Sequence, residues 1–599
     1  MKSASSDSRF TLSPRGRVAL LAILAVVAYL PALRAGFIWD DRLLLTESDL
    51  IKSPNGWLRL WFGAESPDYF PVTYTTFWLE YRLWALNPLG YHLVNVLLHA
   101  ASSIVLWRVL LRLGVPAAWF AAVLFAVHPV NAATVAWVAE RKNTLSMLFY
   151  LSAAIFYFRA EAGRRRSDYA VSLGFFLLAL LSKTSVVMLP PVLLLCAWWQ
   201  RGCISRTDLR RTIPFFALSL AAGLVTVWFQ NHNVINEFEI DLGDFSTRLV
   251  RAGCAVSFYA GQLVFPWNLS LLYPRWDVHA SSLHWILPAL LPLAVMLAAA
   301  FFRRSWGRPV LFAMGYFLLS LLPVLGFLRM YYFRLSPVAD QWLYIPGIGI
   351  LALAAAAGMA ATRRWPLARS CIAGAIVAAL AVQTWQRAVV MQSSGTLWAD
   401  VLRRDPSSWT AELNLAIHDL SQGGRESALA HARRAAELEP GFVESYLNLG
   451  AIFDVNGLGA ESIAAYRKAI DLKPGYAQAH NELAIALEGQ GRTDEAVREY
   501  REAVRLRPAN DQFQLNLGAL LFKHGRYDEA IPAFREVVRL RPDSVDGHND
   551  LGASLHSLGR LEEAAAEYRE ALRLNPLHAD ARRNLEAILA TDPSARQLK

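Results

Sequence analysis

Two adjacent carboxylates, Asp40 and Asp41, are the first candidates for acid–base chemistry in this chain. They follow the first long apolar segment and lie in the stretch Gly36-Phe37-Ile38-Trp39-Asp40-Asp41, among aromatic and apolar neighbours. A carboxylate held partly out of water has its pKa raised towards the working pH and can act as a general base. We therefore expect one of the pair to deprotonate an acceptor hydroxyl, and the sequence does not separate the two. The alternative is a solvated pair at a membrane boundary.

Histidines form the second group of candidates. His92, His99 and His128 fall in or beside apolar segments, but no two residues have the spacing of zinc ligands on one helix. Hydrogen bonding inside a helix bundle is the favoured interpretation, with His92 and His128 kept as candidate pocket residues. The four cysteines show neither metal-ligand nor disulfide spacing, so we expect no metal and no cofactor.

The composition indicates what must position these residues. The chain has 599 residues, of which 55% are hydrophobic and 12% aromatic, which is too apolar for an ordinary soluble protein. A net charge of +10 could indicate a nucleic-acid partner. Much of the basic excess, however, sits in short clusters between apolar stretches, as the positive-inside rule requires of a membrane protein. We expect membrane lipid, and no nucleic acid, as a partner.

Apolar segments of spanning length recur from Val18 to about Val390. Arg15 and Arg17 precede the first, and Leu33–Phe37 is a poor cleavage site, so we expect an uncleaved helix rather than a removed signal. The predicted spans are about eleven, at roughly 17–35, 92–113, 115–128, 143–159, 168–182, 185–200, 213–229, 285–302, 309–327, 341–361 and 368–388.

The orientation follows from six basic clusters. All six fall on one side of the membrane if the segment 247–265, which carries Arg248, Arg251 and Gln262, does not cross. We therefore predict a cytoplasmic N-terminus, an external C-terminus, and an interfacial or re-entrant 247–265. The clusters are Arg15/Arg17, Arg108/Arg112, Arg164–Arg166, Arg201/Arg206/Arg210/Arg211, Arg303/Arg304/Arg308 and Arg363/Arg364/Arg369.

The last third of the chain repeats every 34 residues. Prolines, glycines and leucines keep this step, each leucine is followed by Ala or Gly, and an aromatic residue recurs with them. This is the tetratricopeptide pattern, in which small residues let two helices approach and proline ends the second helix. We predict five repeats over about 407–576 and a capping helix near 579–589, with a concave face that binds peptide or protein. The alternative is a spacer or self-association surface.

An Asp-Asp pair after the first span of a multi-span protein resembles the fold-C glycosyltransferases that use polyprenyl-phosphate sugars. The segments Tyr91–His99, His128–Asn131 and Val135–Asn143 resemble one subgroup more closely, the tetratricopeptide-containing protein O-mannosyltransferases. The resemblance covers nearly the whole chain in order. It implies that Asp40 or Asp41 is the base and that the donor substrate is a lipid-linked sugar.

Such a donor needs cations near its leaving phosphate, where negative charge develops. The candidates expected on the external side are Arg141, Lys142, Lys183 and Arg275, each with the alternative role of an interfacial anchor. Asp340, in Val338-Ala339-Asp340-Gln341-Trp342-Leu343-Tyr344, resembles a family motif that precedes a late span, and is the candidate second carboxylate.

The sequence thus predicts an all-α protein with three parts: a transmembrane glycosyltransferase-like domain (1–390), a linker (391–406) and the repeats (407–599). The expected function is transfer of a sugar, with mannose as the leading candidate, from a polyprenyl phosphate to protein hydroxyls that the repeats present. In a bacterium the location would be the inner membrane, with the repeats outside. The alternatives are an inactive membrane-anchored scaffold and an O-antigen-ligase-like enzyme.

Overall fold

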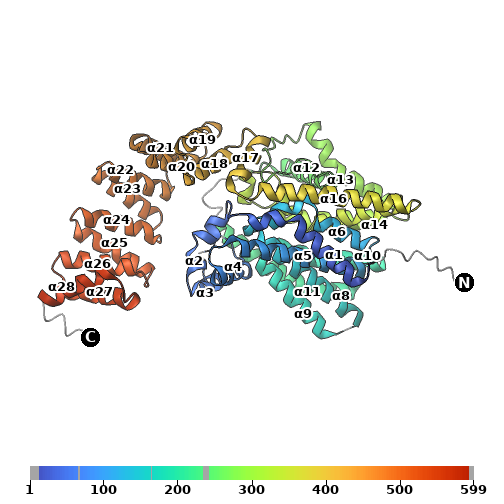
Figure 1. The fold of residues 1–599 in the computed structure, drawn as a ribbon, viewed down its shortest axis with the longest axis horizontal. Helices are drawn as coiled ribbons and strands as arrows, with labels where there is room; N and C mark the ends of the chain where they lie inside the picture. Colours follow the sequence, from blue (N-terminus) through green and yellow to red (C-terminus); the bar gives the residue numbers. More distant parts are fainter. Residues whose placement is uncertain (1–11, 65, 67, 164, 234–241, 592–599) are drawn as a thin grey trace. The chain divides into compact units, whose positions relative to one another are not determined.

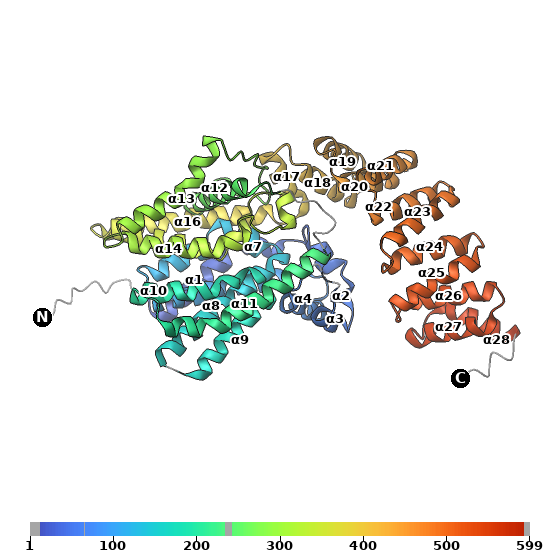
Figure 2. The same cartoon turned by 180° about the vertical axis from the view of Figure 1, so that it is seen from behind.

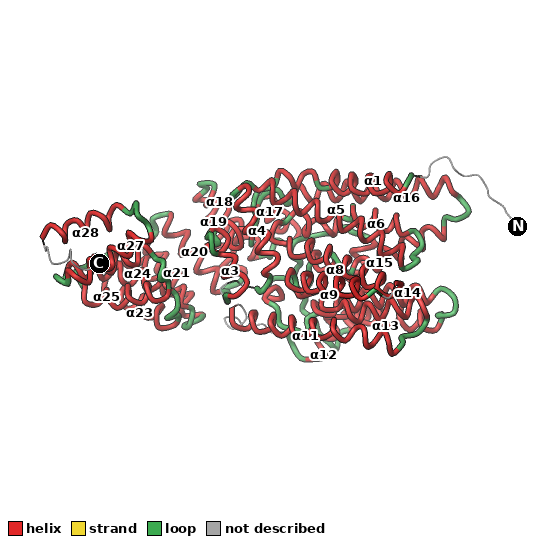
Figure 3. The backbone as a smooth tube through the Cα atoms, turned by 90° about the horizontal axis from the view of Figure 1, so that it is seen from below, coloured by secondary structure: helices red, strands yellow, loops and turns green. Residues whose placement is uncertain are grey.

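The computed structural model describes residues 12–64, 66, 68–163, 165–233 and 242–591. Every regular element in these ranges is a helix (Figure 3). The chain forms two compact units, Met1–Ser407 and Ser408–Lys599, and each has its own buried apolar core. The predicted fold class, an all-α chain of apolar helices followed by tetratricopeptide repeats, is confirmed.

The first unit begins with α1 and runs to α17 (Figure 1). Its α-helices are α1 (Pro14–Ala28), α2 (Asp49–Lys52), α3 (Gly56–Phe62), α4 (Pro71–Trp84), α5 (Pro88–Arg112), α6 (Ala118–Ala126), α7 (Ala132–Ala136), α8 (Arg141–Gly163), α9 (Arg166–Ser182), α10 (Leu189–Arg201), α11 (Arg206–Asn233), α12 (Phe245–Val264), α13 (Leu283–Phe301), α14 (Gly307–Leu321), α15 (Gly347–Ala361), α16 (Pro366–Val390) and α17 (Ser394–Arg404). Short helical turns join them: η1 (Leu30–Arg34), η2 (Arg42–Thr46), η3 (Pro129–Asn131), η4 (Val138–Glu140), η5 (Thr184–Met188), η7 (Leu322–Val324), η8 (Tyr331–Arg334) and η9 (Asp340–Leu343).

Five helices of the described residues are long and apolar enough to cross a membrane: α5, α11, α13, α14 with its extension to Val324, and α16. The pair α6 and η3–α7 would be a sixth span, bent by 48°. The predicted total of eleven crossings remains a prediction. α12, which occupies the segment predicted not to cross, is not among these spans and packs along α13 and α15.

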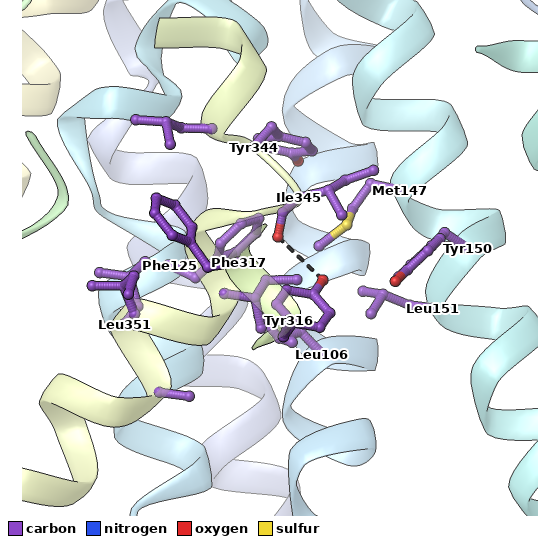
Figure 4. Close-up of a cluster of buried hydrophobic side chains, with 14 of the residues drawn as sticks. Leu106, Phe125, Met147, Tyr150, Leu151, Tyr316, Phe317, Tyr344, Ile345 and Leu351 are labelled. Atoms are coloured by element: carbon purple, nitrogen blue, oxygen red, sulfur yellow. Dashed lines mark hydrogen bonds between the residues drawn. The ribbon is translucent and has the colours of Figure 1, made fainter. Parts of the chain in front are cut away.

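The core of this unit lies between α5, α6, α8, α10, α14 and α15. Figure 4 shows how side chains from separate helices meet there, with Leu106 from α5, Phe125 from α6 and Tyr150 from α8. The hydroxyl of Tyr316 donates to the carbonyl of Ile345 at 3.1 Å, which joins α14 to the start of α15. These helices hold the loops between them at fixed positions.

The second unit is a stack of helix pairs, visible in Figure 2 from α18 to α28. The pairs are α18 (Trp409–Ser421) and α19 (Arg425–Leu438), α20 (Val443–Val455) and α21 (Gly459–Leu472), α22 (Ala477–Gly489) and α23 (Thr493–Leu506), α24 (Asp511–Lys523) and α25 (Tyr527–Leu540), and α26 (Val545–Ser557) and α27 (Leu561–Leu574), followed by α28 (Ala579–Thr591).

The periodic residues have the roles that the sequence pattern predicts. A Cβ atom on Gly518 would lie 2.7 Å from the ring of Phe534, so the small residue is what lets the aromatic ring pack between helices. Gly525 has a φ of 74°, the left-handed conformation that ends a helix. Pro542 stands two residues after the end of α25, where it prevents continuation.

Candidate active site

The Asp-Asp pair lies in a tight turn after α1 and η1. The amide of Asp41 donates to the carbonyl of Ile38 at 3.0 Å, and the amide of Gly36 donates to the carbonyl of Gln392 at 2.9 Å. Trp39, between them, has a φ of 45°, a conformation that residues other than glycine rarely adopt. The turn is therefore fixed by its own hydrogen bonds and by the chain that follows α16.

The structure gives the two aspartates different surroundings. Asp41 is fully buried, and both its carboxylate oxygens accept backbone hydrogen bonds: Oδ2 from Ile38 at 2.9 Å and Oδ1 from Ala139 at 2.7 Å. Burial raises the pKa of Asp41 to about 8, against these two hydrogen bonds, which favour the ionised form. Asp41 thus ties the turn to η4 and has no exposed oxygen for a substrate.

Asp40 is partly exposed, and no described residue hydrogen-bonds to its carboxylate. Burial raises its pKa to about 6, Lys142 opposes the rise, and the negative charges of Glu140 and Asp68 add to it. At neutral pH the group is ionised, yet it is a stronger base than an ordinary aspartate. These are the properties that general base catalysis requires.

Glu140 joins two of the predicted cations beside Asp40. Its carboxylate lies 3.4 Å from Lys142 Nζ and 3.6 Å from Lys183 Nζ, and it also accepts a hydrogen bond from the amide of Asn143. Burial opposes its ionisation, but the two ammonium groups bring its pKa below the ordinary value. Burial lowers the pKa of Lys183 to about 8, which leaves it mostly charged at neutral pH. The result is a compact cluster of one acid and two cations.

An open pocket of about 440 Å³ lies beside this cluster, lined by Lys183 and Asn143 among others. Ser320 and Gln341 add further polar side chains to this lining. The pocket is therefore suited to a polar ligand.

A second space adjoins this pocket at Tyr150, which lines both. Its walls come from α5, α8, α10, α14 and α15 and are almost wholly apolar. Figure 4 shows Leu106, Leu151 and Tyr316 on this lining. A polar pocket that adjoins an apolar one suits an amphipathic ligand, with its polar end in the first and its apolar part in the second.

Arg141 has a different environment from its neighbour Lys142. It is fully buried, and its guanidinium donates to Glu80 at 2.6 Å, to the carbonyl of Tyr91 at 2.8 Å and to Asn95. These contacts join α8 to α4 and α5. Its donors are used inside the protein, so we do not assign it a part in phosphate binding.

The other predicted residues do not join the Asp40 cluster. Asp340 is buried and accepts a hydrogen bond from the Tyr273 hydroxyl at 2.7 Å, while Arg275 is exposed and donates to the carbonyl of Arg334 at 3.2 Å. His92 lies 3.3 Å from the carbonyl of Gly36, and His128 lies 3.1 Å from that of Leu263. Both histidines make hydrogen bonds within the bundle, as the favoured interpretation predicts.

Two acids that the sequence pattern did not single out, Glu140 and Asp68, lie close enough for their charges to act on Asp40. Glu140 was visible in the segment Val135–Asn143, where an acid directly precedes two cations. That arrangement could have indicated a buried ion cluster. Asp68 lies in a loop without a distinctive motif, and only the tertiary structure brings its charge close to Asp40.

Comparisons with known proteins match two separate regions. Residues 67–229 match the family model described as dolichyl-phosphate-mannose-protein mannosyltransferase. Residues 413–477, 481–545 and 515–579 match the tetratricopeptide repeat. The first match contains Glu140, Lys142 and Lys183, whereas the Asp-Asp pair precedes it.

Similar proteins of known name are protein O-mannosyl-transferases. A protein O-mannosyl-transferase of Caenorhabditis elegans is 24% identical over 363 residues, which are 56% of this chain and 50% of the relative. Protein O-mannosyl-transferase Tmtc3 of Drosophila melanogaster is 24% identical over 533 residues, 72% of this chain and 56% of the relative. The chain therefore spans about half the length of these relatives.

Among solved structures, YrrB, described as a TPR protein with an unusual peptide-binding site, is 21% identical and covers 32% of this chain and 97% of its own length, with a TM-score of 0.28. The resemblance that the sequence motifs indicated is confirmed by the two matched regions and the named relatives.

Proposed function

We propose that this relative of the tetratricopeptide-containing protein O-mannosyltransferases transfers a sugar, with mannose as the first candidate, from a polyprenyl-phosphate donor to a protein hydroxyl. The observation that carries the proposal is the difference between the two aspartates. One of them is fixed by backbone hydrogen bonds, and the other keeps a free, partly exposed carboxylate beside a cation cluster.

In the proposed reaction, the acceptor oxygen attacks the anomeric carbon of the sugar while the bond from that carbon to the phosphate oxygen breaks. The hydroxyl proton passes to the Asp40 carboxylate, and the bonding electrons leave with the polyprenyl phosphate. Lys142 and Lys183 stabilise the negative charge that grows on the departing phosphate. Glu140 holds both ammonium groups in place through its two ion pairs.

The two adjoining spaces support a lipid-linked donor. Lys183, Ser320 and Gln341 would bind the phosphate and sugar oxygens in the polar pocket. The apolar cavity that continues from Tyr150 would take up part of the isoprenoid chain, because an apolar lining gains stability when it is covered by hydrocarbon. The amphipathic character of such a donor matches both spaces.

The repeats support a protein acceptor. The first helix of each repeat carries one half-buried polar residue at the same position, so the five residues form a row along the face that these helices share. Asparagine side chains both donate and accept hydrogen bonds and carboxylates accept them, so such a row can pair with the N–H and C=O groups of an extended peptide. The row consists of Asn414, Asn448, Glu482, Asn516 and Asp550.

The location belongs to the same proposal. If 247–265 lies outside the spans, the basic clusters would put the Asp-Asp loop and the repeats on one external face, the periplasmic face in a bacterium. Donor, base and acceptor would then meet on the same side of the membrane.

The test is transfer of labelled mannose from a polyprenyl-phosphate donor to endogenous protein, in membranes containing the full chain. Asp40→Asn keeps the size of the side chain but removes proton acceptance, so we expect a loss of about 100- to 10,000-fold. Asp244→Asn is the matched control, because Asp244 is exposed and caps α12, and asparagine caps helices equally well.

If Asp40→Asn transfers sugar at the wild-type rate, Asp40 is not the base. If the wild-type chain inserts normally and transfers no mannose or other sugar from any polyprenyl donor tested, the proposed activity is wrong. Co-purification of partners with the repeats would then favour the scaffold.

A further inference from the structure

Trp398 lies in α17, far along the chain from the Asp-Asp turn, yet it contacts that turn directly. Its side chain is fully buried. Its ring meets the ring of Trp39 edge-on, with centroids 5.2 Å apart and an interplanar angle of 82°. Trp39 is the residue immediately before Asp40, so a side chain outside the matched mannosyltransferase region contacts the neighbour of the proposed base.

Trp39 is held from a second side by Trp137. These two rings stack with centroids 5.2 Å apart and an interplanar angle of 14°. Trp137 stands two residues before Ala139, whose amide binds Asp41. The positive φ of Trp39 is unfavourable for a side chain of this size and persists only where the surroundings enforce it. The two neighbouring rings are those surroundings.

The segment that carries Trp398 is itself fixed to the first unit. The carbonyl of Gln392 accepts from Gly36 at 2.9 Å, and its side-chain amide donates to the carbonyl of Pro31 at 3.0 Å. Ser393 and Thr396 form a capping box at the start of α17, and Arg387 pairs with Asp400 at 2.6 Å. The segment 391–406, expected as a linker, therefore forms a helix that packs inside the first unit.

We propose that Trp398 is a positioning residue for Asp40: its ring, together with that of Trp137, holds Trp39 in its left-handed conformation and so keeps the Asp40 carboxylate in the site. The inference rests on the proposed function for its catalytic consequence. The contact between the rings does not depend on that function.

Loss of the Trp398 ring would let Trp39 relax and give Asp40 more water. We expect kcat to fall by about 10- to 100-fold, the effect of a displacement of about 1 Å in a catalytic group, with little change in the KM for the donor. Because burial raises the pKa of Asp40 to about 6, greater exposure moves the acid limb of the kcat profile to lower pH.

The other groups whose charges act on Asp40 stay in place in this variant. They are Lys142 on α8, Glu140 on η4 and Asp68 before α4, the adjacent Asp41, and the phenols of Tyr74 on α4 and Tyr332 on η8. A shift of the acid limb would therefore report the exposure of Asp40, which a general loss of stability does not change.

The decisive measurement does not need activity. In the full chain with the two exposed cysteines removed (Cys203→Ser and Cys371→Ser), Asp40→Cys is labelled with a water-soluble maleimide. Adding Trp398→Ala should raise the labelling rate at least several-fold, and Trp398→Phe should restore most of the protection. Trp409→Ala is the matched control, since Trp409 is a buried tryptophan that packs on Phe442 in the first repeat.

Equal labelling rates with and without Trp398 would overturn the inference, whether or not the chain transfers sugar. In an active chain, unchanged kcat and acid limb in Trp398→Ala would also overturn it. If Trp398→Ala does not insert, Trp398→Leu is compared with Trp398→Phe, and the inference requires faster labelling in the leucine variant. If the wild-type chain transfers no sugar but Trp398→Ala still speeds the labelling of Asp40→Cys, the positioning role is supported and the proposed function is rejected.

Discussion

Asp41→Asn tests the division of roles within the aspartate pair, because it changes one oxygen of a carboxylate that uses both. Oδ2 accepts from the amide of Ile38 at 2.9 Å and Oδ1 from that of Ala139 at 2.7 Å. Asparagine offers one oxygen and one NH₂ group. Whichever way it turns, one backbone N–H faces another donor and loses its acceptor.

A buried donor without an acceptor costs about 1–3 kcal/mol. We expect Asp41→Asn to be less stable by that amount, with part of the transfer activity kept in the folded fraction. The pH dependence follows from the raised pKa of Asp41, about 8 in the folded chain. The stability that protonated Asp41 contributes is fully present below the pKa of this group in the unfolded chain, about 3.9. It is lost as the pH rises through the folded-state pKa of about 8. Asparagine has no such loss, so the stability advantage of the wild type over the variant should shrink as the pH rises from about 4 to about 8.

The assay is thermal unfolding of the full chain in detergent at several pH values, paired with transfer activity at each pH. Asp40→Asn should show the opposite pattern, with a nearly normal melting temperature and almost no transfer, because no described residue hydrogen-bonds to that carboxylate. A normal melting temperature for Asp41→Asn together with a loss of transfer above 100-fold would refute the reasoning and move the base to Asp41.

Four further predictions concern the donor site, the repeats and the topology. Lys183→Met should lower kcat/KM for the lipid donor about 10-fold or more, whereas the same change at the exposed Arg275 should have little effect in the same kinetic assay. Gly518→Ala would put a Cβ 2.7 Å from an aromatic ring and should destabilise the repeats by about 1–3 kcal/mol in urea titration; Gly489→Ala, with no atom within 4 Å, should not. A fragment of residues 408–599 should be soluble and strongly helical by circular dichroism, because it has its own core, and an unstructured spectrum would contradict this. A C-terminal alkaline phosphatase fusion should be active, since the repeats are predicted to be external. If that fusion is inactive and a C-terminal fluorescent-protein fusion is fluorescent, 247–265 crosses the membrane.

Much of the architecture was predictable because its signals repeat along the chain. The 34-residue step is recorded in every repeat, and the structure places the small residues, glycines and prolines in the predicted roles. The apolar segments predicted the helices, but their number of crossings depends on how short and bent helices such as α6 and α7 sit in a bilayer. Local composition does not determine that.

The sequence by itself determined that an aspartate pair follows the first apolar helix, and that cations and a repeat domain come after it. Only the tertiary structure decided what each residue does. The structural role of Asp41 follows from its hydrogen bond with the amide of Ala139, which lies 98 positions away. Arg141 and Lys142 have different roles because Arg141 donates to Glu80 and to the carbonyl of Tyr91 between helices, whereas Lys142 pairs with Glu140. Neighbours in sequence point in different directions on a helix, so burial and hydrogen-bond partners, which set pKa and access to substrate, arise only when distant segments pack together.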